Sequence, residues 1–121
     1  MLTPEAVWTK APRPPRAWHV AALPIVLAAI KGNQRGLVYA ATGAGKSDAQ
    51  AATLMALEPA PGWVDVVVVP TQHLVEQMAA DLRRWGFKPG RFYGVRQDVE
   101  RVTVVCLPSV QRLAEELEDD D

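Results

Sequence analysis

The stretch Ala40-Ala41-Thr42-Gly43-Ala44-Gly45-Lys46-Ser47 decides the fold of this 121-residue chain. Residues 36–39 before it are apolar and predict a short buried strand, and the Ala-rich residues 48–56 after it predict a helix. A strand, a glycine-rich loop and a helix in this order are typical of a phosphate-binding loop. The reason is that the start of the helix turns free N–H groups and a positive dipole end toward an anion.

Each residue type in this loop suits a part of that chemistry. Gly43 and Gly45 let the backbone approach phosphate closely, because no side chain stands in the way. Lys46 is placed to reach the β- and γ-phosphates and is the candidate catalytic residue, while the Ser47 hydroxyl is a candidate Mg²⁺ ligand. The candidate cofactor-binding residues of the loop are Thr42, Gly43, Ala44, Gly45, Lys46 and Ser47. The alternative is a glycine-rich turn that binds nothing.

Composition limits the class of protein. The length allows one compact domain with a real core. The formal net charge of −1 gives no general basic field, so composition alone gives no argument for nucleic-acid binding. The single cysteine, Cys106, lies in an apolar run and is expected to be a buried thiol. We expect a cytoplasmic protein with no membrane-spanning segment.

Apolar runs and helical patterns alternate along the rest of the chain. Residues 64–69 and 102–107 read as strands buried on both faces of a parallel sheet, and residues 92–95 as a shorter strand. Helices are predicted near residues 17–30, over 48–56, and along two apolar stripes, Leu74, Val75, Met78, Leu82, Trp85 and Val110, Leu113, Leu117. This alternation predicts an α/β fold with a parallel sheet flanked by helices.

The ends of the chain differ in composition from its middle. Residues 1–15 carry four prolines and are expected to be an extended, flexible N-terminus. Residues 118–121 are all acidic and are expected to be a solvated tail. Residues 16–117 would then form the folded part.

Four segments, taken in order, resemble a known family. These are Arg16-Ala17-Trp18-His19, the loop from Ala40 to Ser47, Val69-Pro70-Thr71-x-x-Leu74-Val75-x-Gln77 and Val104-Val105-Cys106-x-x-Ser109-Val110. Together they resemble the first RecA-like lobe of superfamily-2 helicases and translocases, near the type III restriction subunit and DEAD/DEAH-box groups. The general phosphate-loop pattern begins with Gly where Ala40 stands, but alanine is common there in this family. The resemblance implies a partial RecA-like P-loop lobe over residues 16–117, binding ATP and Mg²⁺.

By the same resemblance, Arg16, Trp18 and His19 occupy the segment that reads the adenine ring. The family usually has Gln where His19 stands, since an amide can both donate to and accept from the base. An imidazole offers one donor and one acceptor in a different geometry, so adenine specificity is an open question here. The alternative is that Trp18 packs against a helix and His19 lies at the surface or caps a helix.

The resemblance also implies contacts with a nucleic-acid backbone through Pro70, Thr71 and Ser109. Such contacts position a strand and carry no sequence information. Thr71 could equally cap the helix that follows it. Cys106 replaces the Thr usual in its motif, which removes one hydroxyl from this edge. Five basic residues could extend the track or merely be solvated: Arg83, Arg84, Lys88, Arg91 and Arg96.

Two parts of an ATP-hydrolysing motor are missing from the sequence. No Asp-Glu-x-x motif follows an apolar strand after Leu117, and no second RecA-like lobe supplies an arginine finger. The chain therefore looks like the ATP-binding opening part of a DNA helicase or translocase that does not hydrolyse ATP alone. DNA is favoured over RNA, and a second lobe or a partner chain would be needed. The alternative is a non-catalytic remnant that binds nucleotide or serves as an interaction module.

Overall fold

The computed structural model describes residues 2–34, 45–57 and 61–118. These residues form two compact units, residues 1–58 and residues 59–121. The strand predicted over residues 36–39 and most of the glycine-rich loop lie outside the described residues, as do positions 119–121 of the acidic tail.

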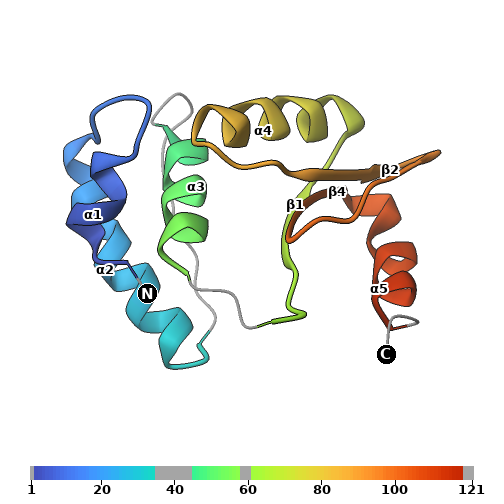
Figure 1. The fold of residues 1–121 in the computed structure, drawn as a ribbon, viewed down its shortest axis with the longest axis horizontal. Coiled ribbons are helices and arrows are strands. Elements are labelled where there is room, and N and C mark those ends of the chain that lie inside the picture. The colour runs from blue at the N-terminus through green and yellow to red at the C-terminus, as the bar shows by residue number, and fades with distance from the viewer. Residues whose placement is uncertain (1, 35–44, 58–60, 119–121) are drawn as a thin grey trace. The chain divides into compact units, whose positions relative to one another are not determined.

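The first unit contains three helices in its described part, α1 (Pro4–Thr9), α2 (Ala17–Lys31) and α3 (Lys46–Ala56). They lie side by side (Figure 1), with α1 contacting both of the others. Alanines make α3 narrow, and Ala51, Ala52 and Ala56 are fully buried. The start of the chain is tied to the end of α3, because the Leu2 N–H donates to the Ala56 carbonyl at 3.1 Å.

Helix α1 lies in the segment expected to be extended. The side chain of Thr3 accepts a hydrogen bond from the Ala6 N–H, and Pro4 stands at the first helical position, where proline is well tolerated. Val7 is fully buried, so burial of an apolar side chain holds the segment in place. Of the four prolines that suggested an extended chain, Pro4 instead begins this helix, while the other three lie between α1 and α2.

The second unit is an α/β sandwich built on four strands in the order β1-β4-β2-β3. Strands β1 (Asp65–Val69), β4 (Val102–Cys106) and β2 (Gly90–Tyr93) are parallel, and the two-residue β3 (Arg96–Gln97) pairs antiparallel with β2. The elements that connect and flank them are α4 (Gln72–Arg84), the 3-10 helix η1 (Leu107–Ser109) and α5 (Val110–Glu118). The mostly parallel α/β architecture predicted from the sequence is confirmed.

The two faces of the sheet are covered differently. Helix α4 runs over one face (Figure 1), where its residues Val75, Met78 and Leu82 are buried. On the other face, Leu113 of α5 packs against Phe92 and Val105. All five residues of β4, which lies between β1 and β2, are buried.

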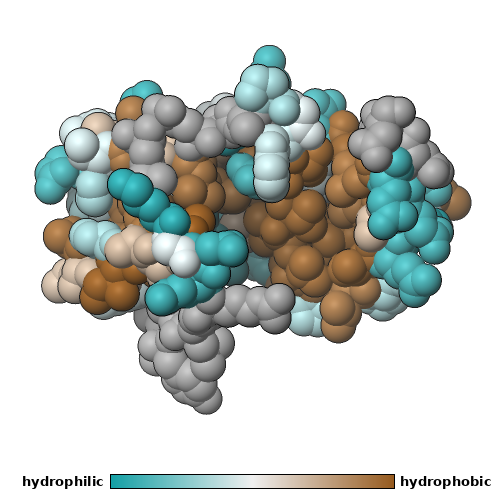
Figure 2. All heavy atoms as spheres, turned by 90° about the horizontal axis from the view of Figure 1, so that it is seen from below, coloured by the Kyte–Doolittle hydropathy of each residue, from teal (hydrophilic) through white to brown (hydrophobic). Residues whose placement is uncertain are grey.

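Strand β1 is less buried than its composition predicts. Val66 and Val68 keep exposed fractions of 40% and 49%. They share a face with Thr103 and Val105 of β4, but α5 packs over β4 and β2. Figure 2 shows apolar atoms gathered on this face of the second unit. The prediction of burial on both faces was right for β4 and wrong for β1.

None of the helices within the described residues is long and apolar enough to cross a membrane.

Candidate nucleotide and nucleic-acid sites

Gly45 is the residue at which the glycine-rich loop enters the described structure. Its φ of 89° lies in the left-handed region, which strongly favours glycine, and it caps the start of α3. Lys46 and Ser47 are the first two residues of that helix. Their N–H groups therefore belong to the first turn, where α-helices have no internal partners for them. Lys46 is exposed and Ser47 half-buried.

Asp48, the next residue, is held by the N-terminal part of the chain. The Arg13 Nε donates to Asp48 Oδ2 at 2.8 Å, and the Asp48 side chain is only 9% exposed. The pair ties the segment before α2 to the first turn of α3. The carboxylate also stabilises that turn, because a negative charge near a helix N-terminus interacts favourably with the dipole.

His19 lies against the same junction from helix α2. It is 2% exposed, and its Nε2 lies 2.8 Å from the Gly45 carbonyl oxygen. On the other side of the ring, Nδ1 accepts the Arg16 N–H at 2.9 Å. The ring stacks on Trp8 at a centroid distance of 5.4 Å and tilts against Trp18 at 4.3 Å.

The three residues of the predicted adenine segment are therefore in different environments. Arg16 is exposed at the N-cap of α2, Trp18 is half-buried, and His19 is enclosed. The structure brings Arg16 and His19 next to Gly45 but leaves Thr42, Gly43 and Ala44 outside the described residues. The alternative interpretation, that Trp18 packs and His19 caps its helix, agrees with these contacts.

The other predicted site residues meet at the carboxyl edge of the sheet in the second unit. Val69 of β1 pairs in register with Cys106 of β4, so the chain leaves both strands at the same edge. Pro70 and Thr71 follow one strand, and Ser109 follows the other in η1. The Cys106 thiol donates to the Pro70 carbonyl at 3.5 Å, which links the two motifs directly. Open α/β sheets place their ligands at this edge.

Thr71 already has a structural role. Its hydroxyl oxygen accepts the Leu74 N–H at 3.2 Å and caps α4. A threonine hydroxyl has a second lone pair and its own proton, so the cap leaves the O–H able to donate to a phosphate oxygen. Both roles proposed for Thr71 are compatible in this geometry.

Three of the five basic residues expected near this edge form ion pairs. Arg84 pairs with Asp81, Arg91 with Glu76, and Arg96 with Asp98, at 3.1, 2.8 and 3.1 Å.

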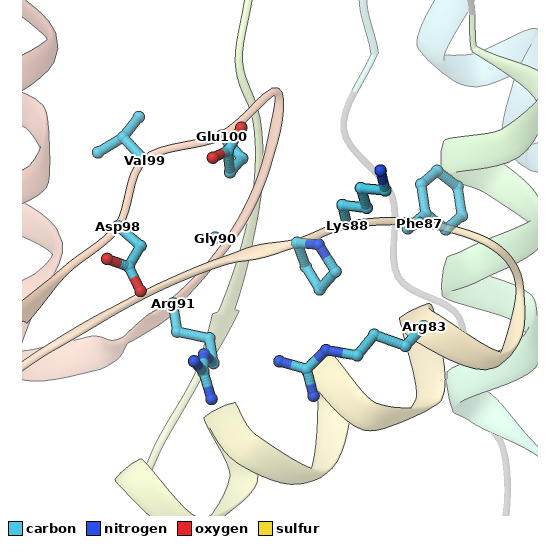
Figure 3. A pocket seen from close by; sticks show the side chains of 9 residues that line it. Arg83, Phe87, Lys88, Gly90, Arg91, Asp98, Val99 and Glu100 are labelled. Atoms are coloured by element: carbon cyan, nitrogen blue, oxygen red, sulfur yellow. The ribbon is translucent and has the colours of Figure 1, made fainter.

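Arg83, Lys88 and Arg91 line a hollow of about 390 Å³ together with Asp98 and Glu100. In Figure 3 the guanidinium groups of Arg83 and Arg91 turn toward each other. This hollow lies where β2 begins, at the opposite end of the strand from the carboxyl edge.

Glu76 ties helix α4 to strand β2. Its carboxylate accepts the Tyr93 hydroxyl and the Arg91 guanidinium, both at 2.8 Å. Partial burial raises the pKa of Glu76, but the two hydrogen bonds and the arginine charge outweigh burial and lower the pKa below its ordinary 4.5. The hydrogen bond between the Tyr93 hydroxyl and the Glu76 carboxylate also raises the pKa of Tyr93.

Sequence reasoning did not find the Arg13–Asp48 pair or the contact between His19 and Gly45. A signal for the first was present, because an Asp directly after Gly-Lys-Ser sits in the first turn of a helix. A contact across 26 positions, as between His19 and Gly45, has no local signature.

A family model described as type III restriction enzyme, res subunit, matches residues 13–121. No curated protein matches the chain. The match begins at Arg13, before the predicted adenine segment, and continues through both motifs of the carboxyl edge. It supports a superfamily-2 helicase-like N-terminal lobe, with ATP and nucleic acid as ligands at the level of the family. The mostly parallel sheet flanked by helices agrees with part of a RecA-like lobe. The chain therefore belongs to the family of type III restriction enzyme res subunits.

Proposed function

We propose that the chain binds Mg-ATP through its glycine-rich loop and contacts a nucleic-acid backbone at the carboxyl edge of its sheet. The observation that carries the proposal is the left-handed Gly45 leading directly into α3, with Lys46 and Ser47 as the first helical residues. This is the geometry that a helix N-terminus needs to receive phosphate.

The described residues fit the nucleotide and its metal. Lys46 is exposed, so its ammonium group can reach the β- and γ-phosphates. Ser47 would hold Mg²⁺, which withdraws negative charge from the phosphate oxygens when bound. Arg13 forms an ion pair with the Asp48 carboxylate, so its positive charge reduces the repulsion between that carboxylate and an incoming phosphate.

For nucleic acid, we propose that Pro70, Thr71 and Ser109 lie along the backbone of a strand. Ser109 is half-buried in η1 and Thr71 is exposed at the start of α4. Hydroxyl donors at one sheet edge are suited to phosphate oxygens, which carry no sequence information. DNA remains our preferred nucleic acid.

We propose that the chain does not hydrolyse ATP by itself. Orienting the attacking water and stabilising the transition state need a carboxylate and an arginine finger, and the sequence has no Asp-Glu-x-x motif after its last strand. A further lobe or a partner chain would supply these groups.

Calorimetry with ATP and Mg²⁺ tests the nucleotide site. Lys46→Ala removes the charge that faces the phosphates and is expected to weaken binding by about 1.5–3 kcal/mol, the range for a hydrogen bond to a charged group. Lys31→Ala, at the exposed far end of α2, is the matched control and should bind like the parent.

A phosphate-release assay on the same samples should show no turnover. Equal ATP affinity in the parent and in Lys46→Ala would overturn the assigned role of the loop. Turnover that Lys46→Ala abolishes would overturn the proposal that the chain is inactive alone.

A further inference from the structure

We infer that His19 is a positioning residue: it holds the Gly45 peptide at the start of α3, and so sets where Lys46 and Ser47 would meet the phosphates of a nucleotide. The inference rests on the proposed function, since it concerns the same site.

The first step is the hydrogen bonding of the imidazole. The Arg16 N–H can only donate, so Nδ1 of His19 must be the acceptor at 2.9 Å. The proton of the neutral ring is then on Nε2, which donates to the Gly45 carbonyl at 2.8 Å. A neutral imidazole has one donor and one acceptor, and this arrangement uses both.

The second step is access. The side chain of His19 is 2% exposed, with Trp8 stacked on it and Trp18 tilted against it. Its Cε1 lies 2.9 Å from the place where a Cβ on Gly45 would stand. A purine could reach the ring only by displacing these neighbours, at the loss of both hydrogen bonds.

The third step concerns the Gly45 peptide, which the imidazole ring of His19 holds by a hydrogen bond. Gly45 has a φ of 89°, and its carbonyl also accepts the Ala49 N–H at 3.4 Å, the first hydrogen bond of α3. His19 thus fixes the last peptide of the loop from outside the helix. The brace sets where the first turn, and with it Lys46 and Ser47, begins.

The test compares ATP and GTP binding by the parent and three variants at His19. His19→Ala should weaken both alike, by about three- to tenfold, the equivalent of one buried hydrogen bond.

Two conservative variants separate bracing from general packing. A Gln amide reaches the position of Nε2 and can still donate to Gly45, whereas an Asn amide reaches only the position of Nδ1. His19→Gln should therefore bind both nucleotides nearly as the parent does, and His19→Asn should resemble His19→Ala. His73→Ala, at the other and exposed histidine of the chain, is the control.

Hydrogen exchange without ligand gives an independent readout. The Ala49 amide, which donates to the Gly45 carbonyl, and the amides of the following turn of α3 should exchange faster in His19→Ala and His19→Asn than in the parent and His19→Gln. Unchanged exchange in all variants would overturn the brace. A preference for ATP of tenfold or more that His19→Ala removes would show that His19 reads the base, and would overturn the inference while the proposed function stands. No nucleotide binding by the parent would overturn the proposed function, while the exchange data would still decide whether His19 holds the start of α3.

Discussion

At the scale of a single residue, Glu76 contributes to the stability of the fold through its charge, although it belongs to neither of the two candidate sites. It stands on α4 and accepts hydrogen bonds from Tyr93 and Arg91 of β2, so one carboxylate joins a helix to a strand. Its side chain is 40% exposed, and solvent therefore screens much of the attraction. The lowered pKa of Glu76 means that its ionised form stabilises the folded state relative to the unfolded state.

We predict that Glu76→Gln lowers the free energy of unfolding by about 0.2–1 kcal/mol at neutral pH. Because folding lowers the pKa of Glu76, the native state holds fewer protons, and this contribution is present above pH 4.5. It is lost as the pH falls through the lowered pKa, so the parent and the variant should converge in acid. Urea unfolding at several pH values measures the difference.

The control is Glu116→Gln on the exposed surface of α5, which should leave the pH dependence unchanged. A difference between Glu76→Gln and the parent that stays constant into acid would contradict the explanation by charge.

At the scale of elements, α4 depends on a cap that is also a proposed contact with nucleic acid. Thr71 accepts the Leu74 N–H and starts the helix that covers one face of the sheet. Thr71→Ala should lower the free energy of unfolding by about 1 kcal/mol, because a backbone donor loses its partner. Thr71→Ser keeps the hydroxyl and should stay close to the parent. Identical urea midpoints for Thr71→Ala and the parent would show that the cap contributes nothing.

Elements could be predicted from the sequence where local chemistry decides them. Helix α4 follows from an apolar stripe with a Thr before it, and β4 from a run of buried β-branched residues. Exposure of Val66 and Val68 could not be predicted, because it depends on where α5 packs, and α5 is distant in sequence. Strand β3 was missed, since a two-residue strand has no periodicity of its own.

At the scale of the whole molecule, five of the thirteen Lys and Arg side chains already form ion pairs with carboxylates. Ion pairs within the chain already engage Arg13, Arg84, Arg91, Arg96 and Arg101. The net charge of −1 adds no long-range attraction. Binding should then depend on a few phosphate contacts near Thr71 and Ser109.

We predict weak, sequence-independent binding of single-stranded DNA that fades with salt. Two or three phosphates neutralised by Lys or Arg side chains would give a slope of log Kobs against log salt of about −1.4 to −2, because each neutralised phosphate releases condensed counterions, whereas the hydroxyl contacts add nothing to the slope. Titration of labelled single strands of different sequence, at several salt concentrations, measures it. Thr71→Ala should weaken binding, and Thr71→Ser should not.

Tight binding that is indifferent to salt, or that selects one sequence, would contradict a backbone-only contact. Binding that is absent even at low salt would favour the alternative of a remnant that holds only nucleotide.

The candidate site was predictable from the sequence to the extent that motifs define it. Lys46 and Ser47 start a helix as the loop pattern requires, and parallel pairing of β1 with β4 brings Thr71 and Ser109 to one edge. The role of His19 could not be predicted, because it depends on how α2 packs against α3. In the structure its Nε2 lies 2.8 Å from the Gly45 carbonyl oxygen, and the role near the adenine ring that the resemblance implies stays a prediction.

The reactivity of the Cys106 thiol can report local opening of the folded protein. It is the only thiol in the chain, and it lies 5% exposed at the seam where β4 meets the end of β1. A thiol reagent can react with it readily only when the residues that cover the thiol move aside. The rate of labelling therefore measures how often this edge of the sheet opens, and it does so in the unaltered protein, without an attached probe.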